Sequence, residues 1–180
     1  IEKICSPFGT KAVVISGAGL ETFLADALHG ATQTINASEH LSLLEGDHHD
    51  HAHHDHVHEE DPHVWLSPEN AVVMAHNICH GLVDAFPQYA AVFEGNFQAL
   101  VADLERLQTY GEETLSSLSC RELITFHDGF SYFAESFGLS ILKAVEEESG
   151  SEASAAELKE LCGLVWEHQL PAVFTETAGS

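Results

Sequence analysis

Residues 122–145, ELITFHDGFSYFAESFGLSILKAV, decide the fold class of this chain. The segments 122–126 and 139–145 are rich in apolar and β-branched residues and are predicted as strands, with residues 129–137 between them as a short helix. The capping box of Ser154 and Glu157 predicts a helix to about residue 168, and residues 171–175 (PAVFT) are predicted as a third strand. Strands that alternate with helices form parallel sheets covered on both faces, so this half of the chain is predicted to be α/β.

Two helices are predicted upstream of this unit. Ser67-Pro68-Glu69 supplies a capping hydroxyl, a proline at the first helical position and an acid in the first turn, which predicts a helix that ends before Pro87. From residue 88 to residue 118, apolar side chains recur mostly at intervals of three and four. Such a helix would be about 45 Å long, so we expect it to run along both halves of the molecule as a rigid connection.

The N-terminal region has a shorter α/β pattern. Residues 11–16 (KAVVIS) are predicted as a strand, residues 17–19 (GAG) as a tight turn and residues 20–28 as a helix, whereas residues 30–60 are predicted as loop. We therefore divide the chain into three parts. Residues 1–66 are predicted to belong to an N-terminal lobe, residues 67–119 to the helical connection, and residues 120–180 to a C-terminal α/β lobe.

A histidine-rich tract lies within the predicted loop. The segment from Asp47 to His63, DHHDHAHHDHVHEEDPH, places eight histidines and six carboxylates within seventeen residues. Imidazole binds zinc, copper and nickel, and carboxylates add oxygen ligands, so residues 47–60 are predicted to be a mobile loop that collects transition-metal ions. The tract has almost no apolar area with which to form a core. Its candidate ligands are His48, His49, His51, His53, His54, His56 and His58.

The same tract leaves two other functions open. Residues 51–56 (HAHHDH) fit the HxHxDH motif of metallo-β-lactamase-like hydrolases, which makes a metal-dependent hydrolase one alternative. A tract composed almost entirely of His and Asp produces such a match easily, and no apolar strand precedes it. The other alternative is a histidine-rich metal buffer or metallochaperone, in which only the tract binds metal.

The composition excludes several classes of partner. Six Lys and Arg against 29 Asp and Glu give a formal charge of -23, which argues against nucleic acid and against an anionic membrane surface. No apolar run reaches the length needed to cross a bilayer, so no direct membrane insertion is predicted. The pairing of Cys5, Cys79, Cys120 and Cys162 is left open, because no CxxC spacing is present.

Two further histidines lie in well-ordered sequence contexts. His63 stands in a turn between Pro62, which restricts the backbone, and Trp65-Leu66, which is expected to anchor the turn in a core. His127 follows the strand predicted at residues 122–126, at the end where open α/β sheets bind their ligands. Each histidine is a candidate metal ligand.

These motifs, in this order, resemble the zinc-binding solute-binding proteins of ABC transporters, the ZnuA-like group of the metal-binding cluster A-I family. The resemblance rests on SGAGLETFL, DPHVWLSPENA, the long helix, ITFHDGFSYFAESFGL, SAAELKEL and PAVFTE, and on the histidine- and acid-rich insert before DPH. It covers nearly the whole chain. The resemblance implies two α/β lobes with parallel sheets, a long rigid helix between them, and a metal ion held in the cleft between the lobes.

The resemblance also implies which residues bind zinc. His63 and His127 match the family's first-lobe and second-lobe ligands, and an imidazole at the second position favours zinc over manganese. Asp128 and Glu176 are further candidates near the implied cleft. The family's upstream histidine and its C-terminal carboxylate have no counterpart, so the chain is expected to be a piece of a longer protein, truncated at both ends, with an incomplete first lobe and no signal segment.

The implied function is extracytoplasmic capture of Zn2+, in the periplasm or on a cell-surface lipoprotein, and its delivery to an ABC permease. Zinc is then the transported ligand, and no organic cofactor is expected. No bond is made or broken in the ligand, so no enzymatic activity is predicted. The protein is expected to act as a monomer.

Overall fold

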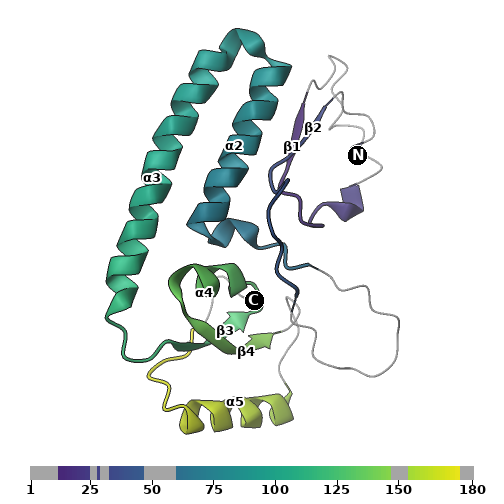
Figure 1. Ribbon diagram of the computed structural model, residues 1–180. Helices are drawn as coiled ribbons and strands as arrows, with labels where there is room; N and C mark the ends of the chain where they lie inside the picture. The colour runs from purple at the N-terminus through teal and green to yellow at the C-terminus, as the bar shows by residue number, and fades with distance from the viewer. Residues whose placement is uncertain (1–11, 25–27, 29–32, 47–59, 147–153, 175–180) are drawn as a thin grey trace.

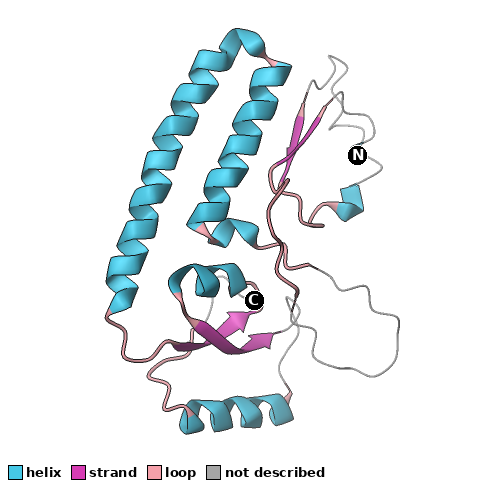
Figure 2. Cartoon of the chain, in the orientation of Figure 1, coloured by secondary structure: helices cyan, strands magenta, loops and turns pink. Residues whose placement is uncertain are grey.

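The chain folds into two small parallel sheets that are bridged by an antiparallel pair of helices (Figure 1). This computed structural model describes residues 12–24, 28, 33–46, 60–146 and 154–174. The elements appear along the chain as β–β–α–α–β–α–β–α, with short 3-10 helices between some of them (Figure 2). The α/β fold class with parallel sheets and a long helix is confirmed.

The first sheet pairs two three-residue strands. β1 (Val13–Ile15) and β2 (Thr34–Asn36) are parallel, with Val14 opposite Ile35. β1 confirms the core of the strand predicted at residues 11–16, but β2 shows that the prediction of loop throughout residues 30–60 was wrong. Residues 34–36 are too few to display an alternating pattern, and the hydrogen bonds that make them a strand come from β1, a distant segment.

The turn after β1 has the tight geometry that its glycines predict. Gly17 and Gly19 have φ angles of 87° and 80°, in the region that favours glycine. The Glu21 carboxylate accepts hydrogen bonds from the backbone N–H groups of Ser16 and Gly17 and so closes the turn. Of the helix predicted at residues 20–28, residues 20–24 and 28 are described: the 3-10 turn η1 (Thr22–Leu24) lies in the first part, and residue 28 is helical.

Two long helices connect the sheets. α2 (Pro68–Ala85) begins where the sequence predicts, because the Ser67 hydroxyl accepts a hydrogen bond from the Asn70 N–H. The 3-10 turn η3 (Pro87–Tyr89) follows, and α3 (Ala90–Ser116) then runs back along α2 (Figure 1). With 27 residues, α3 is about 40 Å long at about 1.5 Å per residue. Its C-terminal part contacts the helix Ser131–Phe137 of the second sheet unit, so the long helix extends to that unit as predicted.

Glycines allow each sheet unit to pack closely on this helical pair. A Cβ atom on Gly81 of α2 would lie 2.6 Å from the Ile35 side chain of β2, so only glycine fits there. A Cβ atom on Gly111 of α3 would overlap the ring of Phe137. The first sheet is thus held on α2, and the helix that carries Phe137 is held on α3.

The second sheet lies between two helices. β3 (Glu122–His127) and β4 (Ser140–Glu146) are parallel, α4 (Ser131–Phe137) covers one face and α5 (Ala155–Glu167) the other (Figures 1 and 2). Ile124, Leu161 and Leu170 form the core on the α5 side. The predicted capping box is present, with Ser154 and Glu157 each bonding the other's backbone N–H.

The third predicted strand, residues 171–175, is not a strand over its described residues 171–174. The Phe174 N–H donates to the Ile124 carbonyl at 3.2 Å, which places it beside β3. One such bond does not make a ladder, although the apolar sequence alone resembles a strand. Thr175 lies outside the described residues.

No helix in the described ranges combines the length and the apolar character that spanning a membrane requires. Cys79, Cys120 and Cys162 carry free thiols, and Cys5 lies outside the described residues.

Candidate metal centre

His63 is held by the rigid turn that starts α2. It directly precedes the 3-10 helix η2 (Val64–Leu66), whose Val64 side chain is completely buried. The Leu66 N–H donates to the His63 carbonyl at 3.2 Å, and Ser67 then caps α2. The His63 backbone is therefore held by the burial of Val64 and by the helix start at Ser67. The prediction that Trp65 anchors this turn in a core was wrong: Trp65 is 41% exposed, Leu66 is only partly buried, and Val64 fills the core instead.

His127 is the last residue of β3. The strand extends one residue beyond the predicted segment 122–126, so His127 belongs to the sheet and does not merely follow it. Its position at the carboxyl end of a parallel strand is the predicted one.

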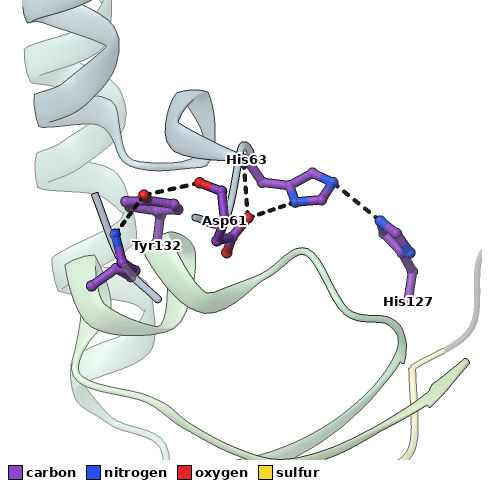
Figure 3. A network of polar contacts seen from close by, with 5 residues as sticks. Asp61, His63, His127 and Tyr132 are labelled. Atoms are coloured by element: carbon purple, nitrogen blue, oxygen red, sulfur yellow. Dashed lines mark hydrogen bonds and ion pairs between the residues drawn. The ribbon is translucent and has the colours of Figure 1, made fainter. Parts of the chain in front are cut away.

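The two imidazoles meet, although 64 residues separate them in the sequence. Their Nε2 atoms are 3.2 Å apart, and the rings lie edge to face with centroids 5.0 Å apart and planes at 78° (Figure 3). Two imidazole nitrogens bound to one tetrahedral zinc ion lie about 3.3 Å apart, given Zn–N bonds of about 2.05 Å. The observed separation is that of a hydrogen bond between the two rings, and it also matches the spacing of two ligands on one zinc ion.

The Asp61 carboxylate sets the tautomer of a neutral His63 ring. Its Oδ1 atom lies 2.7 Å from His63 Nδ1 and also accepts the His63 backbone N–H at 2.9 Å (Figure 3). An ionised carboxylate can only accept, so Nδ1 carries the proton, and a neutral His63 then has a free electron pair on Nε2. This is the tautomer that can bind a metal ion on the side facing His127.

Burial by itself would raise the pKa of the Asp61 carboxyl group. The hydrogen bonds that the carboxylate accepts, chiefly from the His63 ring and backbone and also from Ser131, oppose burial, and the pKa of Asp61 lies below its ordinary value. Asp61 is therefore a carboxylate at neutral pH, as the proposed tautomer of His63 requires.

Gly129 leaves room beside the paired rings. A Cβ atom at this position would lie 2.9 Å from His127 Nε2 and 3.0 Å from His63 Cε1. Any larger side chain would press on both imidazoles at the point where their nitrogens face each other.

Tyr132 of α4 connects the His63 turn to the second sheet unit. Its hydroxyl donates to the Asp61 carbonyl at 3.1 Å and accepts the Leu44 N–H at 2.8 Å (Figure 3). Sequence reasoning identified neither Asp61 nor Tyr132 as part of the site. The Asp-Pro-His spacing was a usable signal for Asp61, whereas no residue near Tyr132 in the sequence indicates that its hydroxyl bonds Asp61.

Of the other predicted ligands, only Asp128 lies within the described residues. Among the described residues, no three His, Cys, Asp or Glu side chains lie close enough together to hold one metal ion. Asp128 follows His127 and is partly buried, but it does not complete such a group, so its role as a ligand stays a prediction. Glu176 and the seven tract histidines, with the hydrolase-like segment 51–56, lie outside the described residues.

Two parallel sheets bridged by a long helix, with one imidazole contributed from the first-lobe side and one from β3, define a metal-binding protein of the periplasmic solute-binding class. A crystal structure of ZnuA has this fold: it matches with a TM-score of 0.82 and 33% sequence identity, over 94% of this chain and 65% of that chain. The model of the family described as zinc-uptake complex component A, periplasmic, matches residues 9–180, and this chain belongs to that family.

Two curated relatives agree with this assignment. A putative metal-binding protein of Treponema pallidum is 30% identical over 180 residues, which are 94% of this chain and 57% of the relative. The high-affinity zinc uptake system protein ZnuA of Bacillus subtilis is 34% identical over 151 residues, which are 81% of this chain and 47% of the relative. The chain thus spans about half the length of these proteins. The family is one of transport components and not of enzymes, so the hydrolase alternative is not favoured.

Proposed function

We propose that this chain captures Zn2+ outside the cytoplasm and delivers it to the permease of an ABC transporter. The observation that carries this proposal is the His63–His127 pair, whose Nε2 atoms have the separation of two ligands of one zinc ion. The names of its relatives, a high-affinity zinc uptake protein among them, support zinc as the ion and uptake as the process.

The site suits an ion that must be both captured and released. The two imidazoles provide nitrogen ligands of intermediate softness, which zinc accepts readily, and the buried Asp61 carboxylate bonds the far nitrogen of the His63 ring. The ligands come from two separate elements, the turn before α2 and the end of β3. A small change in the relative position of these elements would separate the imidazoles and free the ion.

The proposal also covers the division into lobes, the histidine tract and the oligomeric state. Residues 1–66 belong to the first lobe, residues 67–119 to the helical connection and residues 120–180 to the second lobe. The histidine tract at residues 47–60 binds zinc weakly and raises the ion concentration near His63. The protein acts as a monomer and catalyses no reaction.

Zinc titration of single-histidine variants tests the proposal. His63→Ala and His127→Ala should each abolish the tightest zinc-binding phase, measured by competition with a chromophoric chelator. His168→Ala is the matched control, because His168 also bonds a carboxylate, that of Glu122 at 3.1 Å, but lies at the far end of α5. Equal losses in all three variants would contradict the assigned site.

A second variant separates the transport function from metal buffering. Replacing the seven tract histidines by asparagine keeps the length of the tract and should remove only the weak phase. Loss of the tight phase as well would favour the metal buffer. Delivery is tested with the permease in proteoliposomes, where the zinc-loaded chain should stimulate ATP hydrolysis and zinc-treated His127→Ala should not.

A further inference from the structure

We propose that Tyr132 is a positioning residue for the zinc site: its hydroxyl group holds the Asp61–His63 turn in register with the strand that carries His127. This inference rests on the proposed function, because it assigns a role within that site.

The hydrogen bonds around Tyr132 form a closed arrangement. The Leu44 N–H donates to the Tyr132 hydroxyl at 2.8 Å, and that hydroxyl donates to the Asp61 carbonyl at 3.1 Å. The Asp61 N–H donates in turn to the Leu44 carbonyl at 2.9 Å. One hydroxyl thus joins two backbone segments that also bond each other.

Burial protects these hydrogen bonds from exchange with water. Tyr132 is only 2% exposed and Asp61 only 7%, so water does not readily replace a lost partner. A buried backbone group that loses its hydrogen bond is costly, and the two segments therefore keep the spacing that the hydroxyl sets. Burial is the main cause that raises the pKa of Tyr132, and the nearby carboxylates of Asp61, Glu60 and Glu135 raise it further. The hydroxyl is therefore protonated, and able to donate, at neutral pH.

Tyr132 lies in the part of the fold that carries His127, so its contact with Asp61 links the two histidines. α4 starts four residues after His127, so Tyr132 and His127 belong to the same strand–helix unit. Asp61 lies two residues before His63 and bonds the His63 ring and N–H. A single hydroxyl on the His127 side therefore fixes the backbone from which the His63 ring is oriented.

The same hydroxyl also contacts both flanks of the histidine tract. Leu44 and Asp61 lie on either side of residues 47–59, and an antiparallel bridge between Glu45 and Glu60 adjoins them. Tyr132 and this bridge therefore hold the Asp61 segment, which precedes His63, against the Leu44 segment.

Tyr132→Phe tests the proposal, since it removes one oxygen atom and keeps the ring. Tyr110→Phe is the matched control, because Tyr110 lies on α3 and is 65% exposed. Zinc affinity should fall about tenfold in Tyr132→Phe, as for loss of other groups that orient a metal ligand, and should not change in Tyr110→Phe. Affinity is read from the imidazole 15N signals of His63 and His127 during zinc titration.

A spectroscopic measurement separates positioning from stability alone. Without zinc, the His63 ring-nitrogen signals should report a protonated Nδ1 in the wild-type chain and a mixture of tautomers in Tyr132→Phe. Lower stability toward urea with unchanged affinity and unchanged tautomer would overturn the proposal. If the wild-type pair binds no zinc, the proposed function fails, while the zinc-free tautomer signals still decide the role of Tyr132.

A second measurement applies if Tyr132→Phe does not fold. A chain with Phe at the other two tyrosine positions, 89 and 110, keeps Tyr132 as its single tyrosine, which can be labelled as 3-fluorotyrosine. Zinc bound at His63 should shift the 19F signal of Tyr132, and the shift should be absent in the same chain with His63→Ala. A 19F signal that zinc leaves unchanged would refute the coupling.

Discussion

Replacement of Asp61 by asparagine should weaken zinc binding without disrupting the turn. The Asp61 Oδ1 atom accepts from both His63 Nδ1, at 2.7 Å, and the His63 N–H, at 2.9 Å, and an amide oxygen can accept both bonds. Only the negative charge behind the imidazole is lost. Loss of such a partner reduces metal affinity by about 10- to 100-fold, or about 1.4–2.7 kcal/mol.

Competition titration with a zinc chelator measures this change, and the chain supplies a matched control. Asp84 lies 3.4 Å from His80 Nδ1, and both of these side chains are more than half exposed. Asp84→Asn also removes a carboxylate beside a histidine, but solvent screens that pair, so the tight zinc phase should change less than about twofold. The reasoning would be refuted if Asp61→Asn and Asp84→Asn had the same affinity.

Three other changes have expected outcomes. Gly129→Ala should push the paired imidazoles apart and lower zinc affinity at least tenfold by the same titration, whereas Gly95→Ala, where a Cβ meets nothing within 4 Å, should not affect binding. Arg121→Met should lower the free energy of unfolding in urea by about 2 kcal/mol, because Arg121 donates to carbonyls at the ends of α3 and α4. Arg106→Met removes only an exposed pair with a carboxylate and should cost about 0.5 kcal/mol or less, so equal losses would count against this account. The raised pKa of Tyr132 means that its hydroxyl contributes stability below its ordinary pKa of about 10, and that this contribution is lost as the pH rises through the higher pKa of the folded state. The difference in alkaline absorbance titration between wild type and Tyr132→Phe should therefore show its step above pH 10, and a step below pH 10 would contradict the assigned burial.

Local sequence signals predicted the helices well. Ser67 accepts from the Asn70 N–H, and Ser154 and Glu157 bond each other's N–H groups, so each cap finds its partner three residues away and the helix starts follow from the sequence. The long α3 follows from periodicity over many turns. Strand β2 was missed because three residues carry no period, and their partner β1 lies about twenty residues upstream.

The site was predicted only in part, for a related reason. His63 and His127 were identified by their contexts and by resemblance, but their 3.2 Å approach depends on how two distant segments pack. Tyr132 shows the limit most clearly, since its hydroxyl bonds residues 71 and 88 positions away. The sequence ITFHDGFSYFAESF indicates only that Tyr132 is an aromatic residue of the core. Its hydrogen bonds with Leu44 and Asp61 depend on the folded structure.

The close packing of Gly81 on Ile35 and of Gly111 on Phe137 bears on how this protein can evolve. Neither glycine touches the imidazoles, yet each seats one sheet unit against the helical pair. A survey of all single substitutions, selected for zinc-dependent growth, should therefore find two intolerant positions remote from the ion. Alignments that search only for ligands would overlook them, because they preserve a distance and not a chemical group.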